Sequence, residues 1–259
     1  MSLTRLRGTL LGVLVFAAAL AVWDVWPRGE WAAFYFPGVD HIGRTAWDVW
    51  PSSDFLRAVG ASLTRLALGY TLGSLAGIAV GLAMGASSRA RSTLGPTTEF
   101  LRAVPVIAVL PIAIVLLGDG DAMRVGIIAF GVFFPVLVAA VGGVRAVPPE
   151  IRDTAALSRL GGVERAVRVY LPSALPAIFA GLRTALSIGL VLVVISEFTG
   201  RGDGLGVAIW NWQSVSAVPE MYAGILFLGL LGYVLNVLFL VLERRVLAWH
   251  YGAIGERTR

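Results

Sequence analysis

Cysteine and lysine are both absent from this chain of 259 residues, and only two histidines occur. The lack of cysteine excludes disulfide bridges, thiol nucleophiles and cysteine metal sites. The lack of lysine excludes the Gly-Lys-Ser/Thr core of a P-loop, so the chain carries no usual P-loop site for ATP. His41 and His250 are isolated, which predicts that no metal is bound. No grouping of serine, aspartate or glutamate resembles a nucleophile motif, and we expect no catalytic residue.

Charged residues are also scarce, at 14% of the chain, whereas 57% of the residues are hydrophobic and the mean hydropathy is +0.81. A soluble domain carries about a quarter charged residues. Residues 66–86 and 221–242 contain no charge at all, and each run exceeds the ~18 apolar residues that indicate a membrane helix. The sequence therefore predicts an all-α, polytopic membrane protein with one membrane domain.

Apolar runs predict about six transmembrane helices. They cover roughly residues 10–26, 62–86, 97–117, 124–144, 173–198 and 221–242. Pro105 and Pro111 interrupt the third run, which is tolerated where neighbours satisfy the freed carbonyls. Residues 27–53 are aromatic and turn-rich and are expected at the membrane surface, and residues 205–212 form an amphipathic piece. The first run has a cleaved signal peptide as its alternative, although no clear cleavage site follows it.

Every basic residue is an arginine, and the formal net charge is +5. Six spans place both termini on one side of the membrane. The arginines of that side lie at both termini and in two connections: Arg5, Arg7, Arg89, Arg91, residues 148–172, Arg244, Arg245, Arg257 and Arg259. The opposite connections are richer in acids, so the positive-inside rule predicts cytoplasmic termini. Short arginine clusters between apolar runs do not form the single basic face of a nucleic-acid binder.

Five glycines recur every four residues in the second run. They are Gly69, Gly73, Gly77, Gly81 and Gly85. A row with this spacing lies along one helix face and lets another helix backbone approach closely. The alternative is that membrane helices are simply glycine-rich, but five glycines in register favour a packing role.

A few polar residues lie in or beside the apolar runs, where such residues usually face the bundle interior or a cavity. They are Arg65, Glu99, Arg102, Arg183, Glu197 and Asn236. The alternative for Arg65, Glu99, Arg102 and Arg183 is that they reach the membrane interface from span ends. Glu197 is expected near the external mouth of a pathway. Asn236 is expected either to form an interhelical hydrogen bond or to contact solute. The candidates for a translocation path are thus Arg183, Glu197 and Asn236.

A polar segment, residues 148–172, separates the fourth and fifth apolar runs. Pro148-Pro149 marks a helix start, since proline is tolerated in the first turn. Gly161-Gly162 is expected to break this helix, and the apolar periodicity of residues 163–170 predicts a second short helix. Leu171-Pro172 is expected to end it, because proline disfavours the helical conformation of the residue before it. Two short helices that meet at a glycine elbow have the shape of a docking element.

This segment resembles the cytoplasmic signature loop of ABC importer permeases, written as EAA, three residues, Gly, nine residues, Ile-x-Leu-Pro. Aligned from Leu171-Pro172, the leading triplet falls on Asp153-Thr154-Ala155, and 172 − 153 = 19 equals the family distance. Val169 takes the isoleucine position. Asp153 replaces the family glutamate and keeps its charge, whereas Arg159 stands where the family has glycine, with the glycines two residues later.

The flanking residues 171–186 and 195–200 further resemble permeases of sulfonate, taurine, nitrate and pyrimidine-precursor importers. The resemblance covers roughly residues 57–245. It implies a type I ABC importer (MetI-like) transmembrane fold for that domain, preceded in residues 1–56 by a transmembrane helix and an external segment. Residues 246–259 are then a basic cytoplasmic tail.

The resemblance also implies a function and partners. The chain is expected to be the permease subunit of an importer in the bacterial inner membrane, forming the path of a small organic or oxyanion solute. Its implied partners are a cytoplasmic ABC ATPase dimer, an extracytoplasmic solute-binding protein, a second permease copy and membrane lipid. ATP and magnesium belong to the ATPase, so this chain is expected to carry no cofactor and to be no enzyme.

In the resembling family the signature loop docks into a groove on the ATPase, which implies coupling roles here. The residues concerned are Asp153, Thr154, Ala155, Leu157, Ser158, Arg159, Leu160, Gly161, Gly162, Leu171 and Pro172. The tip, residues 157–162, is expected to enter the groove. Asp153 is expected to anchor the loop by capping backbone amides or by pairing with an arginine. The alternative is a membrane scaffold or membrane-embedded enzyme whose arginine-rich loop binds lipid headgroups or another protein.

Overall fold

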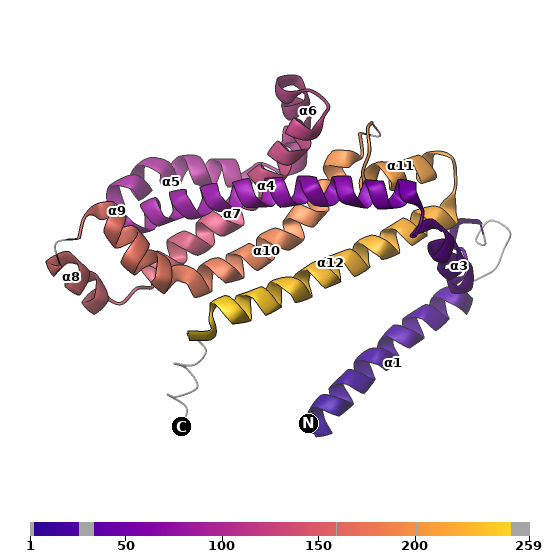
Figure 1. Ribbon diagram of the computed structural model, residues 1–259, viewed down its shortest axis with the longest axis horizontal. Coiled ribbons are helices and arrows are strands. Elements are labelled where there is room, and N and C mark those ends of the chain that lie inside the picture. Colours follow the sequence, from indigo (N-terminus) through magenta and orange to yellow (C-terminus); the bar gives the residue numbers. More distant parts are fainter. Residues whose placement is uncertain (1–2, 26–33, 159, 200, 250–259) are drawn as a thin grey trace.

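The computed structural model describes residues 3–25, 34–158, 160–199 and 201–249, and these residues are almost entirely helical (Figure 1). The helices are α1 (Leu3–Val25), α3 (Val39–Val49), α4 (Ser53–Ala86), α5 (Ser88–Ala103), α6 (Val106–Leu117), α7 (Asp121–Arg145), α8 (Pro149–Leu157), α9 (Gly162–Arg165), the π-helical turn η1 (Ala166–Tyr170), α10 (Leu171–Glu197), α11 (Leu205–Ser214) and α12 (Val218–Val246). No strand occurs within the described ranges, and the predicted all-α class is confirmed.

Four helical stretches are long and apolar enough to cross a membrane: α4, α7, the stretch 162–197 and α12. The pair α5 and α6 passes the same test when taken together. The 23-residue α1 corresponds to the first predicted span. These segments agree with the prediction of about six apolar spans.

The third span is interrupted at Pro105, as predicted, and the interruption is a sharp bend. The helix ends at Ala103, Val104 is extended, and α6 starts after Pro105 at an angle of 97° to α5. Pro105 disfavours the helical conformation of the residue before it, and it lacks the N–H that a continuing helix needs. Pro111, in contrast, lies inside α6.

The fifth span differs from its prediction. Residues 162–197 form one helical stretch of 36 residues, so the second short helix expected after the glycines is the beginning of this span. Leu171 is helical, at φ −60° and ψ −52°, and Pro172 does not end the helix. A proline ring inside an α-helix clashes with the carbonyl four residues earlier. The π turn η1 lies directly before Pro172 and widens the helix at those carbonyls.

The core of the bundle lies where α7 packs against α4 on one side and α10 on the other. Leu66, Ile128 and Leu192 represent the three helices in this core. The glycine row of α4 lies against α7. A Cβ added to Gly77 would lie 2.7 Å from the carbonyl oxygen of Phe133, and one added to Gly81 would lie 2.6 Å from a side chain of α7. The two backbones therefore approach each other as closely as glycine permits.

The bundle has two distinct ends (Figure 1). At one end lie α8, α9, the beginning of α5 and the end of α12, which carry Arg89, Arg91, Arg152, Arg165, Arg244 and Arg245. We name this the basic end. At the other, the acidic end, lie α3, α11 and the turn before α7, with Asp40, Asp48, Asp119, Asp121, Asp203 and Glu220. The N-terminal end of α1 and the C-terminal end of α12 both point away from the acidic end (Figure 1).

Candidate functional site

The segment 148–172 protrudes at the basic end, where α8 lies beyond the ends of the spans (Figure 1). Its first helix starts at Pro149, as predicted, with Pro148 as the residue before it. The Thr154 hydroxyl donates to the carbonyl of Glu150, and the Ser158 hydroxyl donates to that of Thr154, at 2.8 Å each. Both hydroxyls therefore bond within their own helix and leave the outer surface of α8 to other groups.

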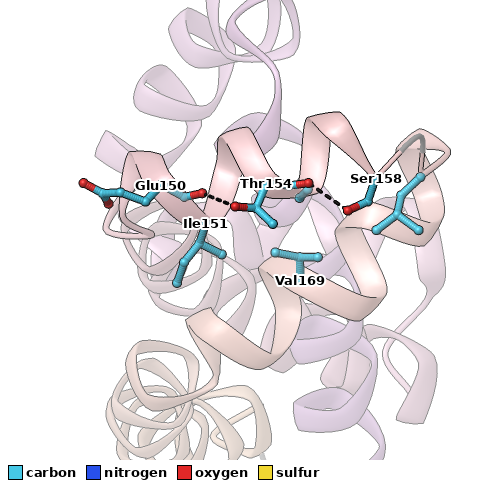
Figure 2. A pocket seen from close by; sticks show the side chains of 7 residues that line it. Glu150, Ile151, Thr154, Ser158 and Val169 are labelled. Atoms are coloured by element: carbon cyan, nitrogen blue, oxygen red, sulfur yellow. Dashed lines mark hydrogen bonds between the residues drawn. The ribbon is translucent and has the colours of Figure 1, made fainter.

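A hollow of about 330 Å³ lies between α8 and η1 (Figure 2). Its lining is mostly apolar and comes from Glu150, Ile151, Thr154, Ala155, Ser158, Leu160 and Val169. Ala155 is buried, whereas Ile151 is exposed at the rim. Two members of the signature alignment, Ala155 and Val169, thus lie on the same hollow from opposite elements.

The tip of the protrusion carries two highly exposed apolar side chains. Leu157, at the end of α8, is 83% exposed, and Val163, in the first turn of α9, is 80% exposed. Leu157 lies outside the apolar stretches, and Val163 lies in the first turn of the stretch 162–197. Large apolar side chains that are exposed together outside the membrane mark a surface for a partner.

The protrusion is anchored to the bundle by Arg152. Its guanidinium donates to the carbonyls of Val144 and Arg145, which end α7. These carbonyls lie in the last turn of α7, where an arginine interacts favourably with the helix dipole. Asp153, the expected anchor, is exposed, and no partner for it occurs among the described residues. Within the described residues Arg152 anchors the protrusion, and the anchoring role of Asp153 stays a prediction.

α8 ends at Leu157 and α9 starts at Gly162, so the expected break lies at the glycines, but neither glycine needs a conformation that other residues avoid. Gly161 has φ −61° and ψ 160°, which other residues adopt, and Gly162 is the first residue of α9. A Cβ added to either glycine would meet nothing within 4 Å. The turn is instead supported by Arg165, which donates to the carbonyl of Leu160 at 3.1 Å. Arg159 lies outside the described residues.

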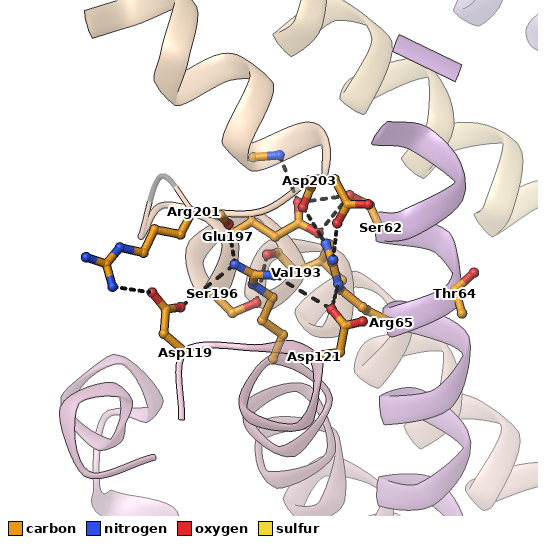
Figure 3. A network of polar contacts seen from close by, with 12 residues as sticks. Ser62, Thr64, Arg65, Asp119, Asp121, Val193, Ser196, Glu197, Arg201 and Asp203 are labelled. Carbon is orange, nitrogen blue, oxygen red and sulfur yellow. Dashed lines mark hydrogen bonds and ion pairs between the residues drawn. The ribbon is translucent and has the colours of Figure 1, made fainter. Parts of the chain in front are cut away.

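A buried polar network joins the spans at the acidic end (Figure 3). Glu197, the last residue of α10, is fully buried. Its carboxylate accepts hydrogen bonds from the Ser62 hydroxyl at 2.8 Å, from Arg65 at 2.7 Å and from the Gly206 amide at 2.9 Å. Glu197 therefore ties α4, α10 and α11 together, and its position at the mouth of a pathway stays a prediction.

Arg65 lies at the centre of this network and is only 4% exposed. Besides Glu197 it binds Asp121 at the start of α7, at 2.7 Å, and both the carbonyl and the carboxylate of Asp203. The hydrogen bond from Arg65 lowers the pKa of Asp203 below its ordinary value, and the partial burial of Asp203 opposes this shift. Arg65 thus does not extend to the membrane interface, which was the alternative expectation.

Arg124 contacts the connection between α10 and α11, to which Asp203 also belongs. It is buried, donates to the Arg201 carbonyl and lies 3.8 Å from Asp119 and 3.7 Å from Asp121. Sequence reasoning missed Arg124, Ser62 and Asp203 as members of a site. The available signal was that charged or hydroxyl residues stand at the acidic-end boundaries of several different spans.

The remaining path candidates lie elsewhere. Arg183 of α10 pairs with Glu243 near the end of α12, at the basic end. Asn236 is half-buried in α12. Arg102 pairs with Glu99 three residues earlier in α5 and is half-exposed. The role of Glu197, Arg183 and Asn236 in a translocation path stays a prediction.

Arg102 also lines a separate open hollow of about 530 Å³ between α5, α7 and α10. Its other walls are Phe134, Pro135, Val138, Ala139, Ala177, Ala180, Gly181 and Thr184. No group of three or more potential metal ligands occurs in the described part of the chain.

The comparisons with known proteins agree with one another. The family model described as "Binding-protein-dependent transport system inner membrane component" matches residues 69–248. SsuC of Bacillus subtilis, named as an aliphatic sulfonates transport permease, is 30% identical over 93% of this chain and 88% of its own length. The nitrate import permease NrtB of Leptolyngbya laminosa is 31% identical, covering 73% of this chain and 67% of its own.

The taurine transport system permease TauC of Escherichia coli is 36% identical, over 73% of this chain and 69% of its own length. Among solved structures, the inward-facing MetNI methionine ABC transporter matches with a TM-score of 0.64 at 18% identity, over 74% of this chain and 95% of that chain. The match at this identity concerns the fold, and it agrees with the predicted importer architecture.

Proposed function

This chain belongs to the family of binding-protein-dependent transport system inner membrane components, and on that premise we propose that its segment 148–172 couples ATP hydrolysis on a separate subunit to solute passage. The chain is the membrane-spanning permease subunit of an ABC importer. Such a subunit works with an ATPase and with a solute-binding protein. The subunit described here lacks lysine and hence the P-loop of the motor.

The observation that carries the proposal is the apolar tip of the protrusion. Leu157 and Val163 are about four-fifths exposed at the end of α8 and the start of α9, and the chain's own core does not cover them. Fully burying one leucine or valine is worth about 1.5–3 kcal/mol. A groove on the ATPase would supply that burial. Gly161 and Gly162, which need no glycine conformation and face open space, would let the groove approach the backbone closely.

Two features support a rigid connection between the protrusion and the bundle. Arg152 fixes α8 to the end of α7, and α9 continues without a break through η1 into α10. A helix of 36 residues is roughly 54 Å long at 1.5 Å per residue. It ends at Glu197, in the polar network of the acidic end. We therefore expect movement of the tip to reach the outer loop, which is the connection between α10 and α11, through one rigid element.

The distribution of charge supports the orientation. Arginines dominate the basic end and acids the acidic end, and positively charged connections remain cytoplasmic. We propose that the protrusion and both termini face the cytoplasm. The outer loop and α11 then face the solute-binding protein.

The open hollow beside Arg102 supports a solute path that needs two copies of the chain. One copy leaves this hollow open on one side. On α6, which stands away from the other helices in Figure 1, Val115 and Leu116 are 84% and 74% exposed. We propose that a second copy of the permease completes the path and that lipid surrounds the pair.

The solute is proposed to be a small oxyanion or a small organic compound that bears one, such as a sulfonate, taurine or nitrate. The relatives named for these solutes cover two thirds or more of this chain. The test is the ATP turnover of the reconstituted importer in vesicles, measured with each solute and its binding protein. If none of these anions stimulates ATP turnover, the proposed substrate class is wrong.

The coupling role is tested by replacing Leu157 and Val163 together with aspartate. The variant should insert in the membrane normally, while co-purification of the ATPase and solute-stimulated ATP turnover are lost. The matched control is Val215→Asp, because Val215 is 72% exposed after α11 at the opposite end. This control should retain the ATPase.

Two results would contradict the coupling role. One is that the double variant retains the ATPase and normal turnover. The other is that it loses binding to vesicles of anionic lipid while turnover persists, which would favour the alternative of a lipid-binding loop.

A further inference from the structure

A hollow of about 550 Å³ lies at the basic end between α10 and the end of α12. Arg183, Leu240, Glu243, Arg244 and Ala248 line it. Neither the coupling segment nor the network at the acidic end contributes a residue. The hollow is therefore a separate feature of the molecule.

The lining of this hollow carries an excess of positive charge. Arg183 pairs with Glu243, which is 7% exposed. Arg244 is exposed, and no ion pair of its side chain occurs among the described residues. Two arginines against one glutamate leave one net positive charge in the hollow. The guanidinium of Arg244 remains available for an anion.

The surface next to the hollow is apolar. In α12, Leu238 is 59% exposed, Val241 46% and Leu242 52%. Only 6% of the most apolar 18-residue window of this helix is buried inside the protein. In a helix that crosses a membrane, such a surface contacts acyl chains. Arg244 lies two residues before the end of α12, and it therefore stands at the level of lipid headgroups.

We propose that this hollow binds the headgroup of an anionic phospholipid. The phosphate lies between Arg183 and Arg244, and the acyl chains follow the exposed apolar side chains of α12. Arginine matches phosphate oxygens with two parallel hydrogen bonds. Basic pockets between transmembrane helices on the cytoplasmic side hold anionic lipid headgroups in this way. Bound there, the lipid joins α10, the helix that continues from the coupling segment, to α12.

The experiment is native mass spectrometry of the purified full-length protein, titrated with phosphatidylglycerol and with phosphatidylcholine of the same acyl chains. The wild type should retain one phosphatidylglycerol in preference to phosphatidylcholine. Arg244→Gln should weaken phosphatidylglycerol binding by about tenfold, the loss of one charge-assisted hydrogen-bonded contact. Phosphatidylcholine binding should change less, because the choline cation offsets the charge of its phosphate. Arg244 is the variant of choice because Arg183 also supports the fold through Glu243.

The matched control is Arg245→Gln. Arg245 lies next to Arg244 at the same helix end and the same depth, but it does not line the hollow. This variant removes the same charge from the same membrane surface, so it is matched to Arg244→Gln. Because Arg245 does not line the hollow, phosphatidylglycerol binding should stay within about twofold of the wild type. An equal loss in both variants would overturn the site and leave only general attraction of lipid to basic residues.

A third arm separates lipid from free anion. Inorganic phosphate at millimolar concentration should not displace phosphatidylglycerol, because the acyl chains contribute to binding. Displacement would overturn the lipid assignment in favour of a soluble anion. No arm requires the ATPase, so a failure of the coupling role leaves this result unaffected, and the reverse also holds.

Discussion

At the scale of single residues, the loop between α10 and α11 depends on one buried carboxylate. Glu197 accepts hydrogen bonds from α4 and from the backbone of α11, and Ser62 also accepts a hydrogen bond from the Leu205 amide at 2.8 Å. Buried charges persist only when they are paired and hydrogen-bonded. Leaving the Glu197 carboxylate unpaired would cost free energy, and this cost holds each of its hydrogen-bond donors in place.

Replacing Glu197 with glutamine should lower the free energy of unfolding by roughly 3 kcal/mol, because Glu197 is the fully buried counter-charge of the buried Arg65. The comparison variant is Glu99→Gln, which breaks an exposed pair with Arg102. It should change stability by no more than about 0.5 kcal/mol. Denaturant titration of both variants in mixed micelles checks the difference, and equal effects would contradict the structural role of Glu197.

Gly204 is required by both conformation and space. Its φ is +131° and its ψ is 162°, a combination open essentially only to glycine. An added Cβ would also collide with the carboxyl group of Glu197. Gly204→Ala should destabilise the protein by about 1–3 kcal/mol. Gly161→Ala should not destabilise the protein, because Gly161 has a negative φ and open space around it. Melting temperatures in detergent measure both, and a stable Gly204→Ala variant would refute the argument.

Asp203 makes the network sensitive to acid. Its pKa is lowered in the folded protein, chiefly by the hydrogen bond from Arg65. A carboxylate whose folded pKa is depressed stabilises the fold above its unfolded pKa of about 3.9, and this contribution is lost as the pH falls through the folded pKa. The difference in melting temperature between the wild type and Asp203→Asn should therefore be full at neutral pH and shrink below about pH 4. A difference that does not vary with pH would contradict this assignment.

At the scale of elements, the interface between α4 and α7 is built on the absence of side chains. The glycine row lets the carbonyl of Phe133 approach Gly77 and the side chain of Ala140 approach Gly81. Between membrane helices, dispersion and close backbone contact replace the hydrophobic effect as the source of stability. Filling this interface must separate the two helices.

Gly77→Leu or Gly81→Leu should reduce folding yield and thermal stability by at least about 1–3 kcal/mol, the usual cost of overpacking. The control is Gly60→Leu in the same helix, where an added Cβ meets nothing within 4 Å. Its stability should be unchanged or slightly higher, because leucine has the better helix propensity. Yield in membranes and thermal unfolding are the measurements, and a normal Gly77→Leu variant would remove the packing argument.

At the scale of the whole molecule, two ends with opposite functions are joined by one long helix. The stretch 162–197 starts in the protrusion and finishes at the polar network. The network therefore limits where the far end of this helix can move. In the coupling role proposed above, movement of the protrusion would reach the loop between α10 and α11 without a flexible joint along the way.

The absence of cysteine allows a direct test of the orientation. A single cysteine at Ser158 should resist a membrane-impermeant maleimide added to intact cells, whereas one at Val215 should react. Both side chains are exposed and stand at opposite ends of the bundle. After the cells are opened, both should react. Reaction of the Ser158 variant from outside would invert the proposed topology.

The sequence alone determined the all-α membrane class, the start of α8 at Pro149 and the family resemblance. These features depend on hydropathy, on proline chemistry and on the spacing of neighbouring residues, all of which are local. The glycine row of α4 is of the same kind, because a period of four residues along one helix is visible without knowledge of the partner helix.

Only the tertiary structure decided the roles of Arg65, Glu197 and the second half of the segment 148–172. The Ser62–Glu197 hydrogen bond joins residues 135 positions apart, and no periodicity in the sequence relates them. Whether Pro172 ends a helix depended on the π turn before it, and whether Arg65 reaches the interface depended on three distant carboxylates. Buried charges are placed by partners that the fold brings together, which is why local patterns could not assign them.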